Sequence, residues 1–245
     1  IDIAREADVP FLMCTPTWRA NHSRVIDSGV NLSINQDAVR FMKNIRNTPD
    51  SSESMIKIGG MIGCKNDCYQ PDDGLSETES EDFHSWQINQ LAEGDVDFLI
   101  AETLPNVEEA IGIAKALERT GLPYIISFVI DRQGAVLDGT FINDAVKRID
   151  AVTGNNPVAY MVNCAYPTFL NADRQPEELF SRLLGYLANA SSLDHCDLDG
   201  SDDLESEEVT EWGDAMHVLN RTYGINILGG CCGTGPAHLR YLVNH

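Results

Sequence analysis

Two adjacent cysteines, Cys231 and Cys232, lie in the segment Gly-Gly-Cys-Cys-Gly-Thr-Gly-Pro at residues 229–236. Glycines on both sides permit the backbone angles that let two neighbouring side chains reach one point. A third cysteine, Cys164, ends an apolar run far upstream. Thiolates favour zinc over magnesium or calcium because they are soft donors. Three sulfurs with one open position would form a catalytic rather than a structural zinc site.

Other interpretations of the cysteines remain open. The adjacent pair could instead form a disulfide or be small buried apolar residues. Cys64 and Cys68 are interpreted as incidental thiols, with a redox pair or a second metal site as alternatives, since two ligands are too few for structural zinc. Cys14, in a predicted strand, and Cys196, in the acidic segment 191–208, are also interpreted as incidental.

The elements that must position these thiols are β-rich runs alternating with amphipathic stretches, the pattern of a parallel βα protein. Strands are expected at residues 10–15, 55–62, 96–102, 123–130, 158–164, 184–189 and 225–230. Helices are expected at the start of the chain and at 32–45, 83–91, 107–119, 141–152, 176–183 and 207–223. The strands are apolar at successive positions, as expected when both faces of a sheet are covered.

Several strands carry a polar or reactive residue at the carboxyl end: Thr15, Glu102, Cys164, Asn189 and Cys231. In (β/α)8 barrels the carboxyl-terminal rim carries the chemistry. The sequence therefore predicts an α/β fold, a single (β/α)8 TIM-type barrel domain over residues 1–245, with the three cysteines meeting at its rim. Seven strands are one short of closure, so the first strand is expected to precede this segment. An open doubly wound sheet is the alternative, but no glycine fingerprint for phosphate follows the first predicted strand.

Composition excludes several classes of function. The net charge is −21, with 38 acidic and 17 basic residues, which disfavours nucleic acid as a partner. The sequence contains no run of 18 apolar residues, so no membrane span is predicted. Seven cysteines without a secretory signal indicate a reducing, cytoplasmic compartment. No feature of the sequence indicates an oligomeric state.

The motifs at Asn163-Cys164 and at 229–234 resemble the two zinc-binding motifs of the homocysteine S-methyltransferases, a family that includes betaine–homocysteine methyltransferase and the homocysteine-binding module of methionine synthase. The resemblance extends to residues 96–103, which end in Glu102-Thr103, and to residues 127–128 and 189–191. It implies a (β/α)8 barrel that binds Zn²⁺ through Cys164, Cys231 and Cys232.

The resemblance also implies roles for other residues. Glu102 would bind the amino group of homocysteine, and Asn163 would shape the metal pocket. A structural salt bridge for Glu102 and a backbone-bonding role for Asn163 are the alternatives. Thr17 and Trp18 are predicted to bind substrate, in the segment 15–19, which departs from the usual family pattern where the donor would approach. Trp18, Tyr69 and Trp86 could pack an onium donor through a cation–π contact. Trp18 is favoured among them, and Trp86 is expected to belong to the core.

The predicted function is zinc-dependent transfer of a methyl group to the metal-bound thiolate of homocysteine, giving methionine. S-methylmethionine or S-adenosylmethionine is favoured as the donor, with betaine next. Three alternatives remain: an alkyltransferase with another thiol or selenol acceptor, a non-enzymatic zinc or redox protein using Cys231 and Cys232, and a catalytically inactive barrel that acts as a binding partner.

Overall fold

The computed structural model describes residues 1–47, 55–154, 156–194 and 206–245. Its strands form a single parallel sheet in chain order, from β1 to β7. The strands are β1 Phe11–Cys14, β2 Ile56–Gly63, β3 Phe98–Leu104, β4 Tyr124–Phe128, β5 Ala159–Ala165, β6 Leu183–Ala188 and β7 Ile227–Gly230. Each of the seven predicted strands is confirmed.

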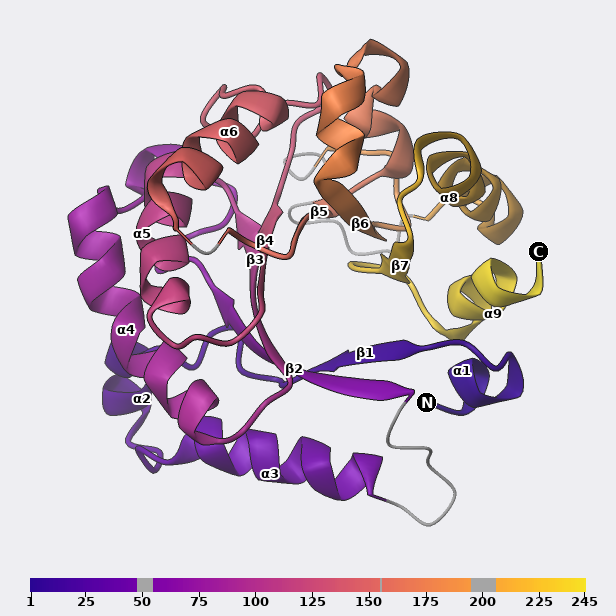
Figure 1. Ribbon diagram of the computed structural model, residues 1–245. Coiled ribbons are helices and arrows are strands. Elements are labelled where there is room, and N and C mark those ends of the chain that lie inside the picture. Colours follow the sequence, from indigo (N-terminus) through magenta and orange to yellow (C-terminus); the bar gives the residue numbers. More distant parts are fainter. Residues whose placement is uncertain (48–54, 155, 195–205) are drawn as a thin grey trace.

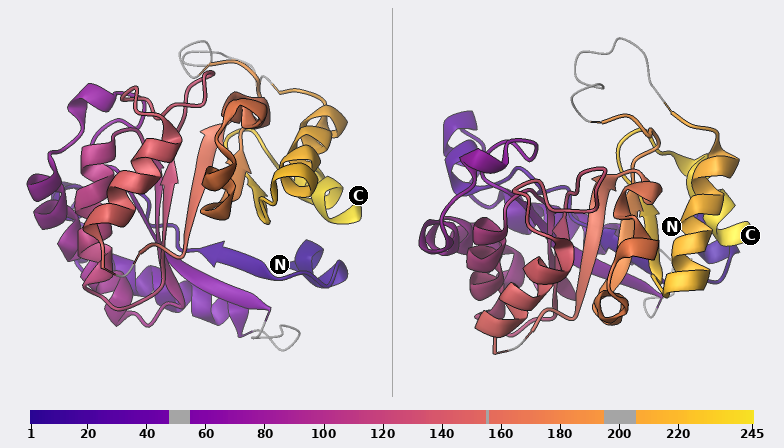
Figure 2. Two further views of the ribbon diagram at one scale, coloured as in Figure 1. Left: turned by 45° about the horizontal axis from the view of Figure 1, so that its top comes forward. Right: turned by 90° about the horizontal axis from the view of Figure 1, so that it is seen from above.

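The helices cover the outer side of the curled sheet (Figures 1 and 2). The α-helices are α1 Asp2–Glu6, α2 His22–Ser28, α3 Ile34–Arg46, α4 Glu77–Glu93, α5 Val107–Glu118, α6 Ile142–Val152, α8 Val209–Tyr223 and α9 Pro236–Asn244. Short 3-10 helices are η1 Pro71–Asp73, η2 Pro167–Leu170, η3 Ala172–Arg174 and η4 Glu177–Ser181. Among the described residues, no helix combines the length and the apolar character that crossing a bilayer requires.

Helix boundaries differ from the prediction where local capping decides them. Helix α4 begins six positions early because the backbone N–H of Ser76 donates to the Glu79 carboxylate at 3.2 Å, which forms a capping box. The predicted helix at 176–183 is instead the 3-10 helix η4 followed by β6. Helices α2 and α9 were not predicted. Asn21 caps α2 by accepting from the Arg24 N–H at 3.1 Å, and Pro236 starts α9.

Two groups of buried apolar residues occupy the two faces of the sheet. The larger group joins strand residues to helix residues such as Ile88 and Ile113. The smaller group contains strand residues alone and fills the inside of the curve: Phe98, Ile100, Ile125, Ala159 and Met161. Burial on both faces explains why these strands are apolar at successive positions.

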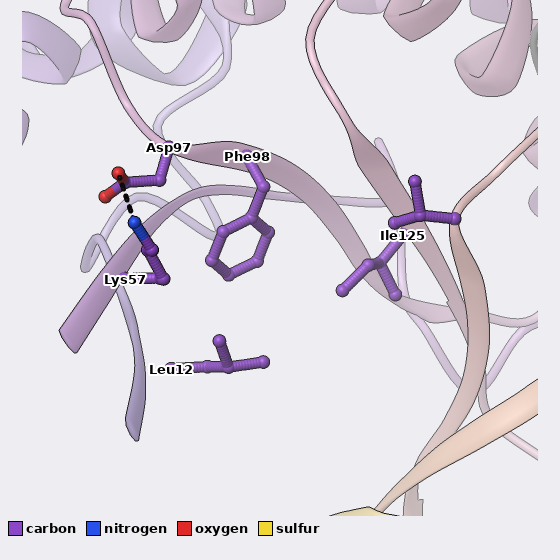
Figure 3. A pocket seen from close by; sticks show the side chains of 6 residues that line it. Leu12, Lys57, Asp97, Phe98 and Ile125 are labelled. Atoms are coloured by element: carbon purple, nitrogen blue, oxygen red, sulfur yellow. Dashed lines mark ion pairs between the residues drawn. The ribbon is translucent and has the colours of Figure 1, made fainter. Parts of the chain in front are cut away.

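The sheet is a TIM-type barrel one strand short. Strands β1 and β7 are its two ends and do not pair with each other, although α1 packs against α9 across the opening. At the amino end of the strands there is a cavity of about 310 Å³, lined by Leu12, Phe98, Ile125 and Val158. Lys57 and Asp97 form an ion pair of 3.7 Å at its edge (Figure 3). This cavity lies at the end of the barrel opposite the cysteines, so it is separate from the candidate site.

Candidate metal centre

Three thiols from two strand ends converge at the carboxyl-terminal rim. Cys164 lies near the end of β5, and Cys231 and Cys232 follow β7 directly. The Cys164 Sγ atom is 2.6 Å from that of Cys231 and 3.9 Å from that of Cys232. All three sulfurs lie within 4.8 Å of one another, and Cys232 is exposed to solvent. This donor set fits a soft metal ion with one side accessible to a ligand from solution.

The backbone is irregular near the carboxyl ends of β3 and β5, beside the three thiols. Cys164 and Thr103 have positive φ angles of 55° and 61°, which non-glycine residues rarely adopt. The register shifts between Ala101 and Leu104 in β3 and between Asn163 and Ala165 in β5. Bulges of this kind re-aim a side chain and occur next to active sites. The strain at Thr103 and Cys164 is thus located beside the candidate site.

Asn163 holds these two irregular segments together. It is 1% exposed. Its Oδ1 accepts from the Thr103 backbone N–H at 2.8 Å and from the Ser127 hydroxyl at 2.7 Å. Its Nδ2 donates to the Thr103 hydroxyl at 2.6 Å. The side chain therefore bridges β3, β4 and β5, and it positions the backbone of its neighbour Cys164.

The turn after β7 is fixed by contacts to β6 and within itself. The Cys231 N–H donates to the Ala188 carbonyl at 2.7 Å, and the Cys232 N–H donates to Asn189 Oδ1 at 3.1 Å. The Thr234 hydroxyl donates to the Cys231 carbonyl at 2.7 Å. A Cβ atom at Gly230 would lie 2.1 Å from the Thr234 hydroxyl oxygen, so this position requires glycine.

Contacts among the three thiols shift their pKa values in opposite directions. Side-chain hydrogen bonds from Cys164 and Cys231 lower the pKa of Cys232 to about 3. Hydrogen bonds to Cys231 and Cys232 raise the pKa of Cys164 far above its ordinary value. A lowered pKa favours the thiolate of Cys232, and a thiolate is the form that binds metals.

A buried carboxylate without a cationic partner lies at the same rim. Glu102 is 9% exposed, and burial raises its pKa to about 7. The Cys14 Sγ atom lies 3.9 Å from Glu102 Oε1. In the described part of the chain, no lysine, arginine or histidine forms an ion pair with Glu102. The structural salt bridge considered for this residue is therefore not found there.

The predicted substrate residues Thr17 and Trp18 follow β1. The hydroxyl of Thr17 is 2.7 Å from that of Thr15 and donates to the Met61 carbonyl at 2.6 Å, while the Met61 N–H donates to Thr15 Oγ1 at 2.9 Å. These bonds occupy the Thr17 hydroxyl in joining β1 to β2. The Trp18 Nε1–H donates to the Glu102 carbonyl at 3.1 Å, so the indole lies at the rim beside the backbone of Glu102.

The remaining cysteines differ in their surroundings. Cys64 and Cys68 are buried and unpaired, and burial raises their pKa values to about 12 and about 11. Cys14, which is interpreted as incidental from the sequence, lies with its Sγ atom 3.9 Å from Glu102 Oε1. The position of Cys14 at the carboxyl end of β1 could have predicted this contact, since other reactive residues also end strands. Cys196 lies outside the described residues.

The roles of Asn189 and Ser127 in this site were also not predicted. Trp86 is half-buried on α4, where its ring meets the His22 ring edge-on with centroids 4.9 Å apart. The prediction that Trp86 belongs to the core is therefore wrong, because its side chain is not among the buried apolar residues.

Comparison with known proteins gives relatives for most of the chain. Residues 5–245 match the family model of the homocysteine S-methyltransferases. Betaine–homocysteine S-methyltransferase 1 of Rattus norvegicus is 31% identical over 184 residues, covering 67% of this chain and 43% of the relative. S-methylmethionine–homocysteine S-methyltransferase of Mus musculus is 30% identical over 181 residues, covering 67% of this chain and 48% of the relative. The chain thus spans about half the length or less of these curated relatives.

A solved structure supports the fold. The metallated form of the homocysteine methyltransferase MmuM from Escherichia coli superposes with a TM-score of 0.73 at 19% identity, covering 98% of this chain and 81% of that one. At this identity the likeness supports the barrel alone. The family model, which matches nearly the whole chain, decides its membership. The chain belongs to the homocysteine S-methyltransferase family.

Proposed function

We propose that this protein transfers a methyl group from a small onium donor to the sulfur of homocysteine, giving methionine, and that it requires zinc. The observation that carries the proposal is the convergence of Cys164, Cys231 and Cys232 beside the unpaired carboxylate of Glu102. Membership of the family supports homocysteine as the acceptor. The thiol cluster supports the metal, because three cysteines with an accessible side suit catalytic zinc.

Cys164, Cys231 and Cys232 would hold the zinc ion. When bound, zinc would act as a Lewis acid that lowers the pKa of a thiol substrate and so supplies a nucleophile at neutral pH. An unassisted thiol with a pKa near 8.5 is mostly protonated there. The chain's own contribution is to fix the three sulfurs, through the Asn163 bridge at β5 and the Asn189 contact at the β7 turn.

Glu102 would bind the ammonium group of homocysteine. Its carboxylate is buried and has no cation within the described residues, so an incoming ammonium would supply the missing counter-charge. Two-point attachment, by sulfur at the cysteines and by nitrogen at Glu102, would orient the nucleophile toward the open side of the barrel. Fixing the reactants in this way supplies a large part of the acceleration in a two-substrate transfer.

For the donor we favour a sulfonium, S-methylmethionine or S-adenosylmethionine, with betaine next. The names of two relatives contain betaine and S-methylmethionine, which supports small methylated onium compounds as a class. The free thiols described above support a reducing, cytoplasmic setting.

The test is a donor screen combined with metal analysis. We expect about one zinc per chain in the purified protein and methionine formation from homocysteine. Cys232→Ser should lose both the zinc and the activity while keeping its circular dichroism spectrum. Cys68→Ser removes a thiol outside the cluster and should retain the metal. Full activity in Cys232→Ser, or a metal-free wild-type protein that still turns over, would contradict the proposal. Greater turnover with a selenol than with homocysteine would favour the alternative acceptor.

A further inference from the structure

The guanidinium group of Arg19 is held at the rim by neutral partners. It lies over the Trp18 ring, 4.1 Å from the centroid. Its Nη1–H donates to the Asn66 carbonyl at 2.5 Å. In the described part of the chain, no carboxylate forms an ion pair with it. The charge of Arg19 is therefore fixed in place but not neutralised.

Such a cation is unexpected in so acidic a chain. The sequence has 38 acidic side chains and 17 basic ones, so carboxylates are abundant as partners. Other arginines of the protein use them, as Arg182 does with Asp150 at 2.8 Å and Arg46 does with Asp97 at 2.7 Å. An aromatic ring and a carbonyl orient a guanidinium without cancelling its charge, which leaves its other N–H groups available to an anion.

Arg19 lies next to the candidate site. The indole that it covers donates to the backbone carbonyl of Glu102, so one tryptophan side chain connects the cation to the residue that carries the buried carboxylate. The ring also packs on Gly63, where a Cβ atom would lie 2.3 Å from Trp18 Nε1. Burial raises the pKa of Cys68, the nearby charge of Arg19 lowers it, and the charges of Asp67 and Cys232 raise it. Arg19 thus faces the same rim as the thiols.

We propose that Arg19 binds a carboxylate of the substrate at the barrel rim. The proposal rests on the proposed function and deepens it, because both homocysteine and the favoured donors carry a carboxylate beside a positive charge. The thiol cluster and Glu102 would take the sulfur and the ammonium group, and both repel a carboxylate. An unneutralised guanidinium supplies the opposite charge and the paired N–H donors that carboxylates prefer.

The experiment compares substrates with and without the carboxylate. Zinc-loaded wild-type protein, Arg19→Gln and Arg19→Lys are titrated by calorimetry and assayed for methionine formation. The acceptors are homocysteine and its decarboxylated analogue, and the donors are S-methylmethionine and its decarboxylated analogue. Arg24→Gln is the matched control, because Arg24 is exposed on α2.

A hydrogen-bonded charge pair predicts a loss of about 10- to 100-fold in affinity for the carboxylate compound in Arg19→Gln. Affinity for the decarboxylated compound should not change, and Arg19→Lys should recover part of the loss.

The pattern of losses identifies which carboxylate is bound. Weaker binding of homocysteine alone assigns Arg19 to the acceptor, and weaker binding of S-methylmethionine alone assigns it to the donor; either result supports the inference. Equal losses for the carboxylate compound and its analogue, or no loss for either substrate, would overturn it. If the wild-type protein forms no methionine, the proposed function fails, and the calorimetric comparison still decides whether Arg19 binds a carboxylate.

Discussion

Glu102 is a buried acid, and no cation of the described residues forms an ion pair with it. Its pKa is raised from 4.5 to about 7 by burial, with no lysine or arginine paired to it. Burial of an unpaired ionised carboxylate is unfavourable, so the ionised form of Glu102 destabilises the folded state. A buried acid with a perturbed pKa at a barrel rim is characteristic of a binding or catalytic residue.

The raised pKa of Glu102 predicts that the free energy of unfolding depends on pH. The raised pKa means that the folded state binds a proton more tightly than the unfolded state. Protonation of Glu102 therefore stabilises the folded state. This stabilisation is complete below about pH 4.5 and is lost as the pH rises through about 7. Glu102→Gln removes the charge, so its stability relative to the wild type should rise between about pH 5 and about pH 8, by up to about 3 kcal/mol. Urea unfolding at the two pH values measures this difference. An equal difference at both pH values would contradict the shifted pKa.

Asn163 offers a second prediction at the scale of one residue. Asn163→Ala leaves the buried Thr103 N–H and the Ser127 hydroxyl without their acceptor. We expect a loss of about 2 to 3 kcal/mol in the free energy of unfolding. We also expect zinc affinity to fall about 10-fold or more, because Asn163 positions the backbone of Cys164. Ser127→Ala, which breaks one of these bonds, is the control and should cost about 1 kcal/mol. Unchanged zinc affinity in Asn163→Ala would show that the bridge does not position the thiols.

At the scale of elements, the loops after β1 and β2 are built against each other at the rim. The Glu109 carboxylate, which is buried on α5, accepts from the Lys65 N–H at 2.8 Å and lies 2.9 Å from the His84 ring nitrogen. Burial alone would raise the pKa of Glu109, but hydrogen bonds from His84 and Lys65 hold it below its ordinary value. Helices α4 and α5 thus anchor the loop that contains Cys68.

Close packing between Gly63 and Trp18 predicts the effect of adding one methyl group. Gly63→Ala should displace the indole from its bond to the Glu102 carbonyl and cost about 1 to 3 kcal/mol in stability. Substrate affinity should fall while the zinc content stays the same, because the thiols lie on other strands. Gly154→Ala is the control, since among the described residues a Cβ atom there meets the flexible Glu118 carboxylate alone, at 3.3 Å. Thermal unfolding and metal analysis measure both effects, and a loss of zinc in Gly63→Ala would contradict this account.

At the scale of the whole molecule, the net charge of −21 opposes compaction through self-repulsion. Salt screens such repulsion, so raising NaCl from about 0.02 M to about 0.5 M should stabilise the folded state. We expect a rise in Tm of a few degrees, which corresponds to about 1 kcal/mol for a chain of this size. KCl at equal ionic strength is the control for specific ion effects. A Tm that falls with salt would indicate that attractive ion pairs outweigh the repulsion.

The sequence by itself determined the seven strands, the barrel and the convergence of the thiols. Apolar β-branched runs identify strands locally, and parallel strands carry their carboxyl ends to one rim. Glycines beside Cys231 and Cys232 are also a local signal. The short helices α2 and α9, and the early start of α4, escaped prediction because capping contacts rather than periodicity decide them.

Only the tertiary structure decided which side chains meet around the thiols. Asn163 joins Thr103 across 60 positions, Cys14 meets Glu102 across 88, and Trp18 reaches the carbonyl of Glu102 across 84. The register also shifts by one residue in β3 beside Thr103 and in β5 beside Cys164, and such a bulge re-aims the neighbouring side chains. A local pattern contains no information on such shifts, because they arise from the pairing of strands that are distant along the chain.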